Sequence, residues 1–294
     1  MSDPNTHAEG NGGGPEGSEA PAARRRRTPW PLAVVAVLFV VVPFLTWYWT
    51  WFGRSLSDEE IERYLGEGKP RHAQHALSQL AERIERGDAG AGRWNARVLG
   101  LASSPSPDVR MTAAWVMGVE HRSEEFRESL ARLLEDPEPI VRRNAALALV
   151  RFGDERCRPE LLAMLRPHGV VAAFRGTALT ALTAGSRVKR DSLLLRFKNP
   201  TGEAGEVRSP LPGTVERASV KEGDVFEAGA ELFALAPDAE QVTDALTGLL
   251  YFGGEDELAD VERYARGVEG MPQDVKTKAA LTAEAIKRRV SQRR

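Results

Sequence analysis

The chain carries no charged side chain between Arg27 and Arg54. The centre of this stretch, from Ala33 to Leu45, consists almost wholly of Ala, Val, Leu and Phe. Because a helix rises about 1.5 Å per residue, the stretch is long enough to cross a hydrocarbon core of about 30 Å. It predicts one transmembrane helix at residues 29–52, which would anchor the rest of the chain and contact membrane lipid.

A cleaved signal peptide is the alternative interpretation, because Arg24 to Arg27 form a basic segment in front of the apolar core. Two features oppose cleavage: the core is longer than a usual h-region, and aromatic residues from Trp47 to Phe52 follow it where small residues would be needed. Arginines precede the stretch and mainly acidic residues follow it, which predicts a cytoplasmic N-terminus. We therefore expect a single-pass protein of the bacterial inner membrane with periplasmic or extracytoplasmic C-terminal domains.

Composition excludes several other classes of protein. Residues 1–28 lack an apolar cluster and predict a disordered cytoplasmic tail. Lys and Arg total 40 against 42 Asp and Glu, so we expect no nucleic-acid partner. Cys157 is the only cysteine, which rules out an intrachain disulfide and a cysteine-based zinc cluster, and the scattered histidines indicate no metal site.

An internal repeat follows the apolar stretch. The pattern V-R-x-x-A-A begins at Val109 and returns at Val141, about 32 residues later, which is a spacing typical of solenoids. A third copy begins at Val275, with lysine in place of the arginine. Each of the first two copies follows a turn rich in Pro, which stops one helix and starts the next. The pattern predicts helix pairs that bury their apolar faces only against neighbouring pairs.

These residues resemble HEAT repeats, in which D-x-x-V-R-x-x-A-A-x-A-L opens the second helix of each pair. Asp136 to Gly153 and Pro107 to Gly118 carry the resemblance. It implies a HEAT-like α-solenoid at residues 53–186, in which Arg110 and Arg142 belong to a structural ladder of ion pairs and do not contact a ligand. HEAT arrays generally bind proteins, so the resemblance also implies a protein partner. Some relatives act on bilin chromophores, which leaves an enzyme of the bilin-lyase type as a distant alternative.

Alternating short strands with Gly and Pro between them are predicted at residues 187–237. The segments Ser209–Val215, Lys221–Phe226 and Gly229–Leu235 resemble the biotinyl/lipoyl fold. Carrier domains of that fold hold their cofactor on a lysine after the last strand, and Ala239 stands about there in this chain. The resemblance therefore implies no cofactor and indicates the unmodified module of membrane fusion proteins. Helical repeat spacing resumes at residues 238–294.

The sequence thus predicts a mainly α protein: a HEAT-like α-solenoid with a small inserted β-sandwich of the biotinyl/lipoyl type and one N-terminal transmembrane helix. No catalytic motif is present, and we interpret the chain as a non-enzyme. The leading hypothesis is a membrane-anchored scaffold or adaptor that binds a protein partner through the solenoid and the unmodified module. Leu211 and Pro212, in a loop expected to be exposed, are the candidate binding residues. The alternative is an accessory periplasmic adaptor subunit of an export or efflux assembly.

Overall fold

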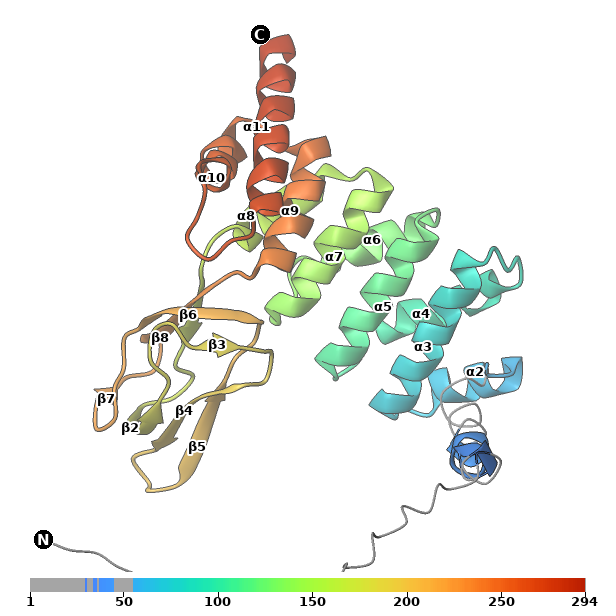
Figure 1. Cartoon of the computed structure of the whole chain (residues 1–294), viewed down its shortest axis with the longest axis horizontal. Coiled ribbons are helices and arrows are strands. Elements are labelled where there is room, and N and C mark those ends of the chain that lie inside the picture. The colour runs from blue at the N-terminus through green and yellow to red at the C-terminus, as the bar shows by residue number, and fades with distance from the viewer. Residues whose placement is uncertain (1–29, 31–33, 36, 45–54, 294) are drawn as a thin grey trace, which may run out of the picture. The chain divides into compact units, whose positions relative to one another are not determined.

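The computed structural model of the chain describes residues 30, 34–35, 37–44 and 55–293. The chain divides into two compact units, Met1–Ser55 and Leu56–Arg294. In the first unit, the described residues before Ser55 are helical and exposed. The second unit contains the helices α2 to α11 and the strands β1 to β8 (Figure 1).

The predicted transmembrane helix at residues 29–52 is not found. Among the described residues, no helix is both long and apolar enough to cross a membrane. On this finding, the transmembrane helix and the single-pass inner-membrane location are wrong. Positions 29, 31–33, 36 and 45–52 of that prediction, like the predicted tail at 1–28, lie outside the described residues.

The helices of the second unit alternate along the chain between a short row and a long row. The short row consists of α2 (Asp58–Gly66), α4 (Asn95–Leu101), α6 (Glu124–Leu133), α8 (Arg158–Met164) and α10 (Glu255–Arg266). The long row consists of α3 (Pro70–Glu85), α5 (Pro107–Glu120), α7 (Pro139–Phe152), α9 (Ala239–Phe252) and α11 (Gln273–Arg293). Each short-row helix packs on the long-row helix that follows it, and successive long-row helices lie side by side (Figure 1). Two 3-10 turns, η1 (Ala91–Trp94) and η2 (Glu155–Cys157), precede α4 and α8. The predicted helical repeats are confirmed, but the predicted region, residues 53–186, is wrong at its end, where residues 168–171 and 176–181 form strands.

Local sequence signals set the helix ends. Pro107 and Pro139 occupy the first turns of α5 and α7, where the missing amide hydrogen costs no helical bond. The side chain of Ser123 accepts a hydrogen bond from the amide of Phe126 and caps α6. Helix α7 ends at Gly153, whose φ of 73° favours glycine.

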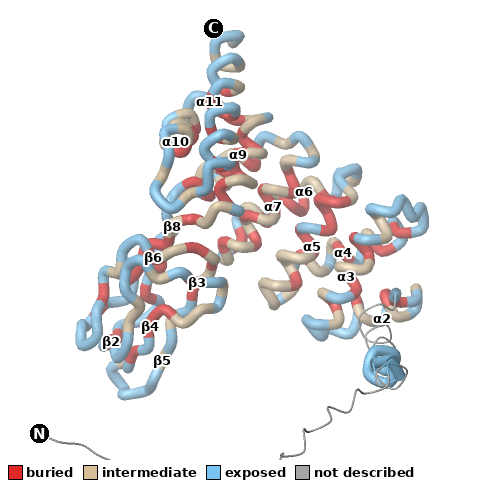
Figure 2. The backbone as a smooth tube through the Cα atoms, viewed as in Figure 1, coloured by how far each residue is buried: buried red, intermediate tan, exposed pale blue. Residues whose placement is uncertain are grey.

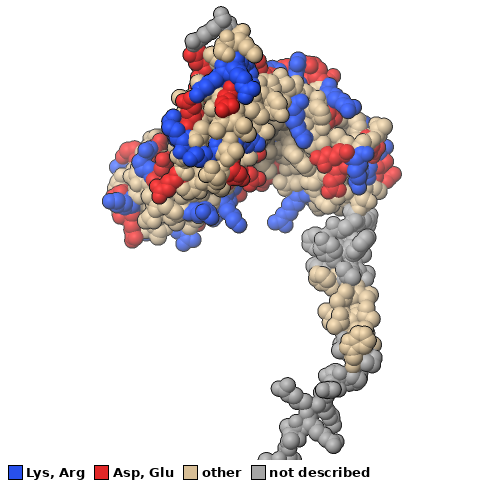
Figure 3. Space-filling view, turned by 45° about the horizontal axis from the view of Figure 1, so that its top comes forward, with Lys and Arg blue, Asp and Glu red and all other residues tan. Residues whose placement is uncertain are grey.

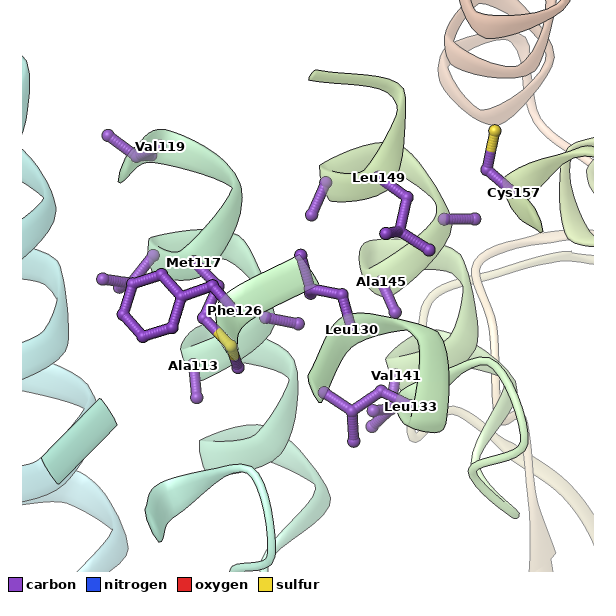
Figure 4. Close-up of a cluster of buried hydrophobic side chains, with 14 of the residues drawn as sticks. Ala113, Met117, Val119, Phe126, Leu130, Leu133, Val141, Ala145, Leu149 and Cys157 are labelled. Carbon is purple, nitrogen blue, oxygen red and sulfur yellow. The ribbon is translucent and has the colours of Figure 1, made fainter. Parts of the chain in front are cut away.

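The helical core lies between the two rows and contains the paired alanines of the repeat. Ala113, Ala114, Ala145 and Ala146 are all fully buried, as the repeat pattern predicts. Figure 2 shows the buried segments along the facing sides of the helices, and Figure 4 shows α6 side chains filling the space beside α5 and α7. Small residues bring the long-row helices close together: a Cβ on Gly118 would lie 2.6 Å from the Cβ of Ala148.

A β module is inserted between α8 and α9. Its strands are β1 (His168–Val171), β2 (Gly176–Ala181), β3 (Arg187–Val188), β4 (Leu193–Lys198), β5 (Ala204–Arg208), β6 (Gly213–Ala218), β7 (Val225–Phe226) and β8 (Glu231–Ala236). They form two four-stranded sheets, ordered β1-β8-β6-β3 and β5-β4-β2-β7. All strand pairs within them are antiparallel. Strands β1 and β2 precede residue 187, where the alternating pattern was predicted to begin.

The module is built from two equivalent halves, β2-β3-β4 and β6-β7-β8. In each half the strands contain six, two and six residues. Strand β3 pairs with β6, and β7 pairs with β2, so each half gives its short strand to the other half's sheet. The turns match as well: the amide of Gly185 donates to the carbonyl of Val215, and the amide of Gly223 donates to the carbonyl of Ala178. This exchange interlocks the halves.

The predicted β-sandwich of the biotinyl/lipoyl type is wrong in its architecture. Apolar residues from both sheets share one buried cluster, but the two four-stranded sheets stay separate and do not form a closed sandwich. The exchanged strands β3 and β7 lie at the edges of the sheets and contain two residues each. Ala239, which stands about where a carrier domain would have its lysine, is the first residue of α9, and Asp238 caps that helix.

The helical array continues across the inserted module. Helix α8 packs on α9, and residues of α8 and α9 belong to the same buried cluster as those of the earlier helices. Ion pairs also cross the insertion: Arg158 pairs with Glu257 at 2.8 Å, and Arg166 pairs with Asp260 at 2.7 Å. The hydroxyl of Tyr264 donates to the carbonyl of Leu165 at the end of α8. These contacts hold α8 against α10, although the module separates them in sequence.

Candidate interaction surface

Large apolar side chains are exposed on the long row and not on the short row. Trp115 on α5 is 41% exposed, Tyr251 on α9 is 62% exposed and Leu281 on α11 is 59% exposed. Among the described residues of the short-row helices, no large apolar side chain is exposed to this extent. Exposed tryptophan and tyrosine are the residue types most often found at the centres of protein interfaces. The long row is therefore the candidate interaction surface.

The repeat explains the position of two of these residues. Trp115, Leu147 and Leu281 each follow directly after the paired alanines of their repeat copy. The alanine pair of the first two copies is buried between helices, which places the next side chain on the outward face of the long row. Leu147 is partly buried and packs against the core. The sequence analysis missed Trp115 and Leu281 as candidate interface residues. Their position directly after an Ala-Ala pair was the signal that could have identified them.

The arginines of the repeat stabilise the scaffold, as the HEAT resemblance implied. Arg110 on α5 forms a two-point ion pair with Asp136, in the turn before α7. Burial raises the pKa of Asp136, but hydrogen bonds from Arg110 and from the amide of Glu138 outweigh this effect and lower it overall. Arg142 donates to the carbonyl of Asp136 and pairs with Glu160 at 3.3 Å. Neither guanidinium is free to bind a partner.

A buried polar cluster joins the β module to the solenoid. Arg143 is 4% exposed and donates to the side-chain oxygen of Gln241, whose amide nitrogen donates to the carbonyl of Pro212 at 2.7 Å. The Nε of Arg143 lies 3.8 Å from Glu160 and has no hydrogen-bond partner among the described atoms. Burial lowers the pKa of Arg143 to about 10. We call Arg143, Glu160, His168, Pro212 and Gln241 the junction cluster.

His168, the first residue of β1, belongs to the same electrostatic environment. Burial and, to a smaller extent, the nearby guanidinium groups of Arg143 and Arg142 together lower its pKa to about 4. Burial raises the pKa of Glu160, although both arginines oppose this shift. The junction cluster therefore contains one arginine, a neutral histidine and one largely shielded carboxyl group, and Arg142 lies beside it.

A second contact between the module and the solenoid is exposed. Arg190, in the turn between β3 and β4, forms an ion pair with Asp108 in the first turn of α5. Both side chains are partly accessible to solvent. The module is thus held at two places, by the junction cluster beside α7 and α9 and by the Arg190–Asp108 pair at α5.

The predicted binding residues lie at the junction. Leu211 is 1% exposed, and Pro212 is half-buried and accepts the hydrogen bond from Gln241. The exposed loop expected around these residues is therefore absent. Whether either residue binds a partner stays a prediction. Sequence reasoning also missed Arg143 and Gln241, which are 98 residues apart in the chain.

Two grooves lie at the carboxyl ends of the long-row helices. One, of about 740 Å³, is lined by residues from the ends of α3 and α5, by the loop that follows α3, and by Arg151 of α7. The other, of about 500 Å³, lies between α9 and α11 and is lined by Leu250, Leu281, Ala285, Arg288, Arg289 and Gln292. Acidic and basic side chains are interspersed over the visible face of the second unit (Figure 3).

Few groups in the described part of the chain suit metal binding or nucleophilic chemistry. No cluster of three or more His, Cys, Asp or Glu side chains that could hold a metal ion occurs among the described residues. Cys157 is fully buried, and burial raises the pKa of its thiol to about 12, so the reactive thiolate is scarce near neutral pH.

Comparison with known proteins identifies the repeat. Residues 95–183 match the family model for HEAT repeats. The match runs from α4 through α8 and includes the first strands of the module, β1 and β2. No curated protein matches the chain. The comparisons indicate a helical repeat scaffold of the kind that commonly mediates protein interactions, and they do not show the lipoyl-like resemblance of the module.

Proposed function

We propose that this protein is a non-enzymatic scaffold that binds a protein partner through the exposed side of its long helix row. The observation that carries the proposal is the uneven distribution of exposed apolar side chains, with Trp115, Tyr251 and Leu281 on the long row and none on the described short row. The HEAT-repeat match supports the same function, because arrays of this kind commonly bind proteins. The alternative of an accessory export subunit rested on the lipoyl-type sandwich and gains no support from the two separate sheets.

Trp115 is the anchor of the proposed interface. It is large and already partly enclosed by its neighbours, so a partner can bury the remaining surface with little loss of side-chain entropy. Truncation of such a central aromatic residue typically costs a complex about 2 kcal/mol or more. Leu147 extends the apolar surface along the row.

Site-specific photo-crosslinking in the native cell tests this function. A photoreactive phenylalanine derivative replaces Trp115 in one variant and Arg132, an exposed residue of the short-row helix α6, in the control. We expect a discrete protein adduct from position 115 and much less from position 132. An equal yield at both positions, or no adduct at position 115, would contradict the proposal. Circular dichroism checks that both variants keep the helical fold.

A further inference from the structure

The groove between α9 and α11 has an apolar floor. Leu250 comes from the last turn of α9, and Leu281 and Ala285 come from one face of α11. Leu281 is 59% exposed, so much of its apolar surface remains uncovered in the free chain. At about 500 Å³, the groove has room for a few side chains of a partner. Its floor suits one or two branched aliphatic side chains.

The rim of this groove is basic, and no acidic residue lines it. Arg289 donates to the carbonyls of Leu250 and Gly253, so it caps the end of α9 and forms no ion pair with an acidic side chain among the described residues. Arg288 is largely exposed and forms an ion pair with Glu284, one helical turn earlier, at 3.6 Å; because both side chains are exposed, this pair is weak. Glu284 and the partial negative charge at the α9 terminus together offset only part of the two positive charges of Arg288 and Arg289.

We propose that this groove binds an acidic amphipathic helix of a protein partner. Aliphatic side chains of the partner would cover Leu281 and Leu250, while its carboxylates would pair with Arg288, and the charge of Arg289 would attract them from its capping position. A helix laid in a groove presents apolar anchors on one side and charges along its edge, which matches an apolar floor with a basic rim. The inference rests on the proposed function, since Leu281 stands at the repeat position of Trp115, and it specifies the chemistry of the partner segment.

Charge complementarity favours a carboxylate-bearing peptide over a nucleic acid. Both carry anionic groups that arginine binds, but only the peptide has aliphatic side chains for the apolar floor. Binding of a peptide must therefore depend on Leu281 as well as on Arg288. Binding of an oligonucleotide would depend on the arginine and fall steeply with salt.

Binding of defined peptides to the full chain tests this inference. The probe is a fluorescent twelve-residue peptide that repeats Glu-Glu-Leu-Leu, and the matched peptide has glutamine in place of every glutamate. Fluorescence anisotropy measures binding to the parent chain and to the variants Leu281→Ser, Arg288→Glu and Arg132→Glu, of which the last is an exposed control on α6. We expect both groove variants to weaken binding of the acidic peptide about tenfold or more, as is usual for central interface residues, and the control to leave it within about twofold.

Several outcomes would overturn the inference. These are no saturable binding of the acidic peptide, equal binding of the glutamine peptide, an unchanged affinity in Leu281→Ser, or an equal loss in Arg132→Glu. Tighter binding of a single-stranded oligonucleotide, independent of Leu281, would assign the groove to nucleic acid instead. If position 115 crosslinks a protein in the cell but the peptide measurements contradict binding in the groove, the inference about the acidic partner helix is wrong and the proposed function stands. If position 115 gives no adduct, the proposed function itself fails.

Discussion

The guanidinium of Arg110 holds both carboxylate oxygens of Asp136, with the Nε–Oδ2 distance at 2.7 Å and the Nη2–Oδ1 distance at 2.8 Å. The same guanidinium donates to the carbonyl of Ser104 at 2.8 Å, which satisfies a further donor. Both side chains are largely shielded from solvent. This pair links α5 to the turn that starts α7, so it fixes the spacing of two neighbouring repeats.

Removal of one partner of this pair should destabilise the array. In Arg110→Met the aliphatic stem remains, but the shielded Asp136 carboxylate loses its ion-pair partner and keeps only the hydrogen bond from the amide of Glu138, at a cost of about 3 kcal/mol in the free energy of unfolding. Arg127→Met is the matched control, because its ion pair with Glu124 is exposed and worth at most about 1 kcal/mol. Urea denaturation followed by circular dichroism compares them. An equal decrease in the free energy of unfolding in the two variants would show that the Arg110–Asp136 pair stabilises the fold no more than an exposed ion pair does.

Replacement of glycine by alanine should have opposite effects at two helix positions. At Gly118 the new Cβ would lie 2.6 Å from the Cβ of Ala148, so Gly118→Ala should force α5 and α7 apart and cost about 1–3 kcal/mol. At Gly100 in α4, no atom lies within 4 Å of the new Cβ, so Gly100→Ala should stabilise the chain by about 0.5–1 kcal/mol. Thermal denaturation measures both shifts. A neutral Gly118→Ala would mean that the helices can separate without loss of packing.

His168 should make stability depend on pH in acid. Its pKa is about 4 in the folded chain, below the usual value of about 6.5, so the unfolded chain binds the proton more readily between these values. The contribution of the neutral histidine is therefore fully present above about pH 6.5 and declines as the pH falls toward 4. Because the side chain is only half-buried, we expect a loss of at most about 2 kcal/mol.

Comparison of the parent with His168→Gln isolates this effect. Glu160, whose pKa is raised, contributes with the opposite sign and is the same in both chains. Urea denaturation at several pH values between 4 and 7 should show a flatter profile for His168→Gln than for the parent. Parallel profiles would refute the assignment.

The Arg190–Asp108 pair should restrain the β module without adding much to global stability. The pair is partly exposed, so its removal should change the free energy of unfolding by at most about 1 kcal/mol. We expect Asp108→Arg or Arg190→Asp alone to broaden the distance distribution between the module and the solenoid. The double exchange should narrow it again by restoring opposite charges. Single-molecule energy transfer between dyes on exposed residues of β4 and α3 measures these distributions.

High salt provides an internal control, since screening should weaken both the attraction in the parent and the like-charge repulsion in the single variants, so that their distance distributions become more alike. If the double exchange behaves like the single variants, the pair does not position the module.

Local sequence features determined the helical array. The V-R-x-x-A-A pattern marked where α5, α7 and α11 form, and the paired alanines of α5 and α7 are buried because only small side chains fit between their helices. Pro107 and Pro139 marked two helix starts. These signals are readable because an α-helix is stabilised by contacts within one turn of the chain.

At residues 168–181, local sequence features did not predict the secondary structure correctly. These residues were included in the α-solenoid predicted at residues 53–186, yet they contain β1 and β2, because β1 pairs with β8 and β2 pairs with β4 and β7. The apolar stretch before Arg54 was interpreted as a membrane span from its composition alone, and no described helix there is long and apolar enough to cross a membrane. A strand obtains its hydrogen bonds from another segment, so its own residues specify it only in part.

The sequence by itself determined the repeat, its register and the residues that face the helical core. Only the tertiary structure decided that β3 and β7 exchange between sheets, that Leu211 is buried, and that Arg143 meets Gln241 across the insertion. The physical reason is the range of the interactions. Helical periodicity records contacts between residues three or four positions apart, whereas strand exchange and the junction cluster depend on groups that meet only after distant segments have packed.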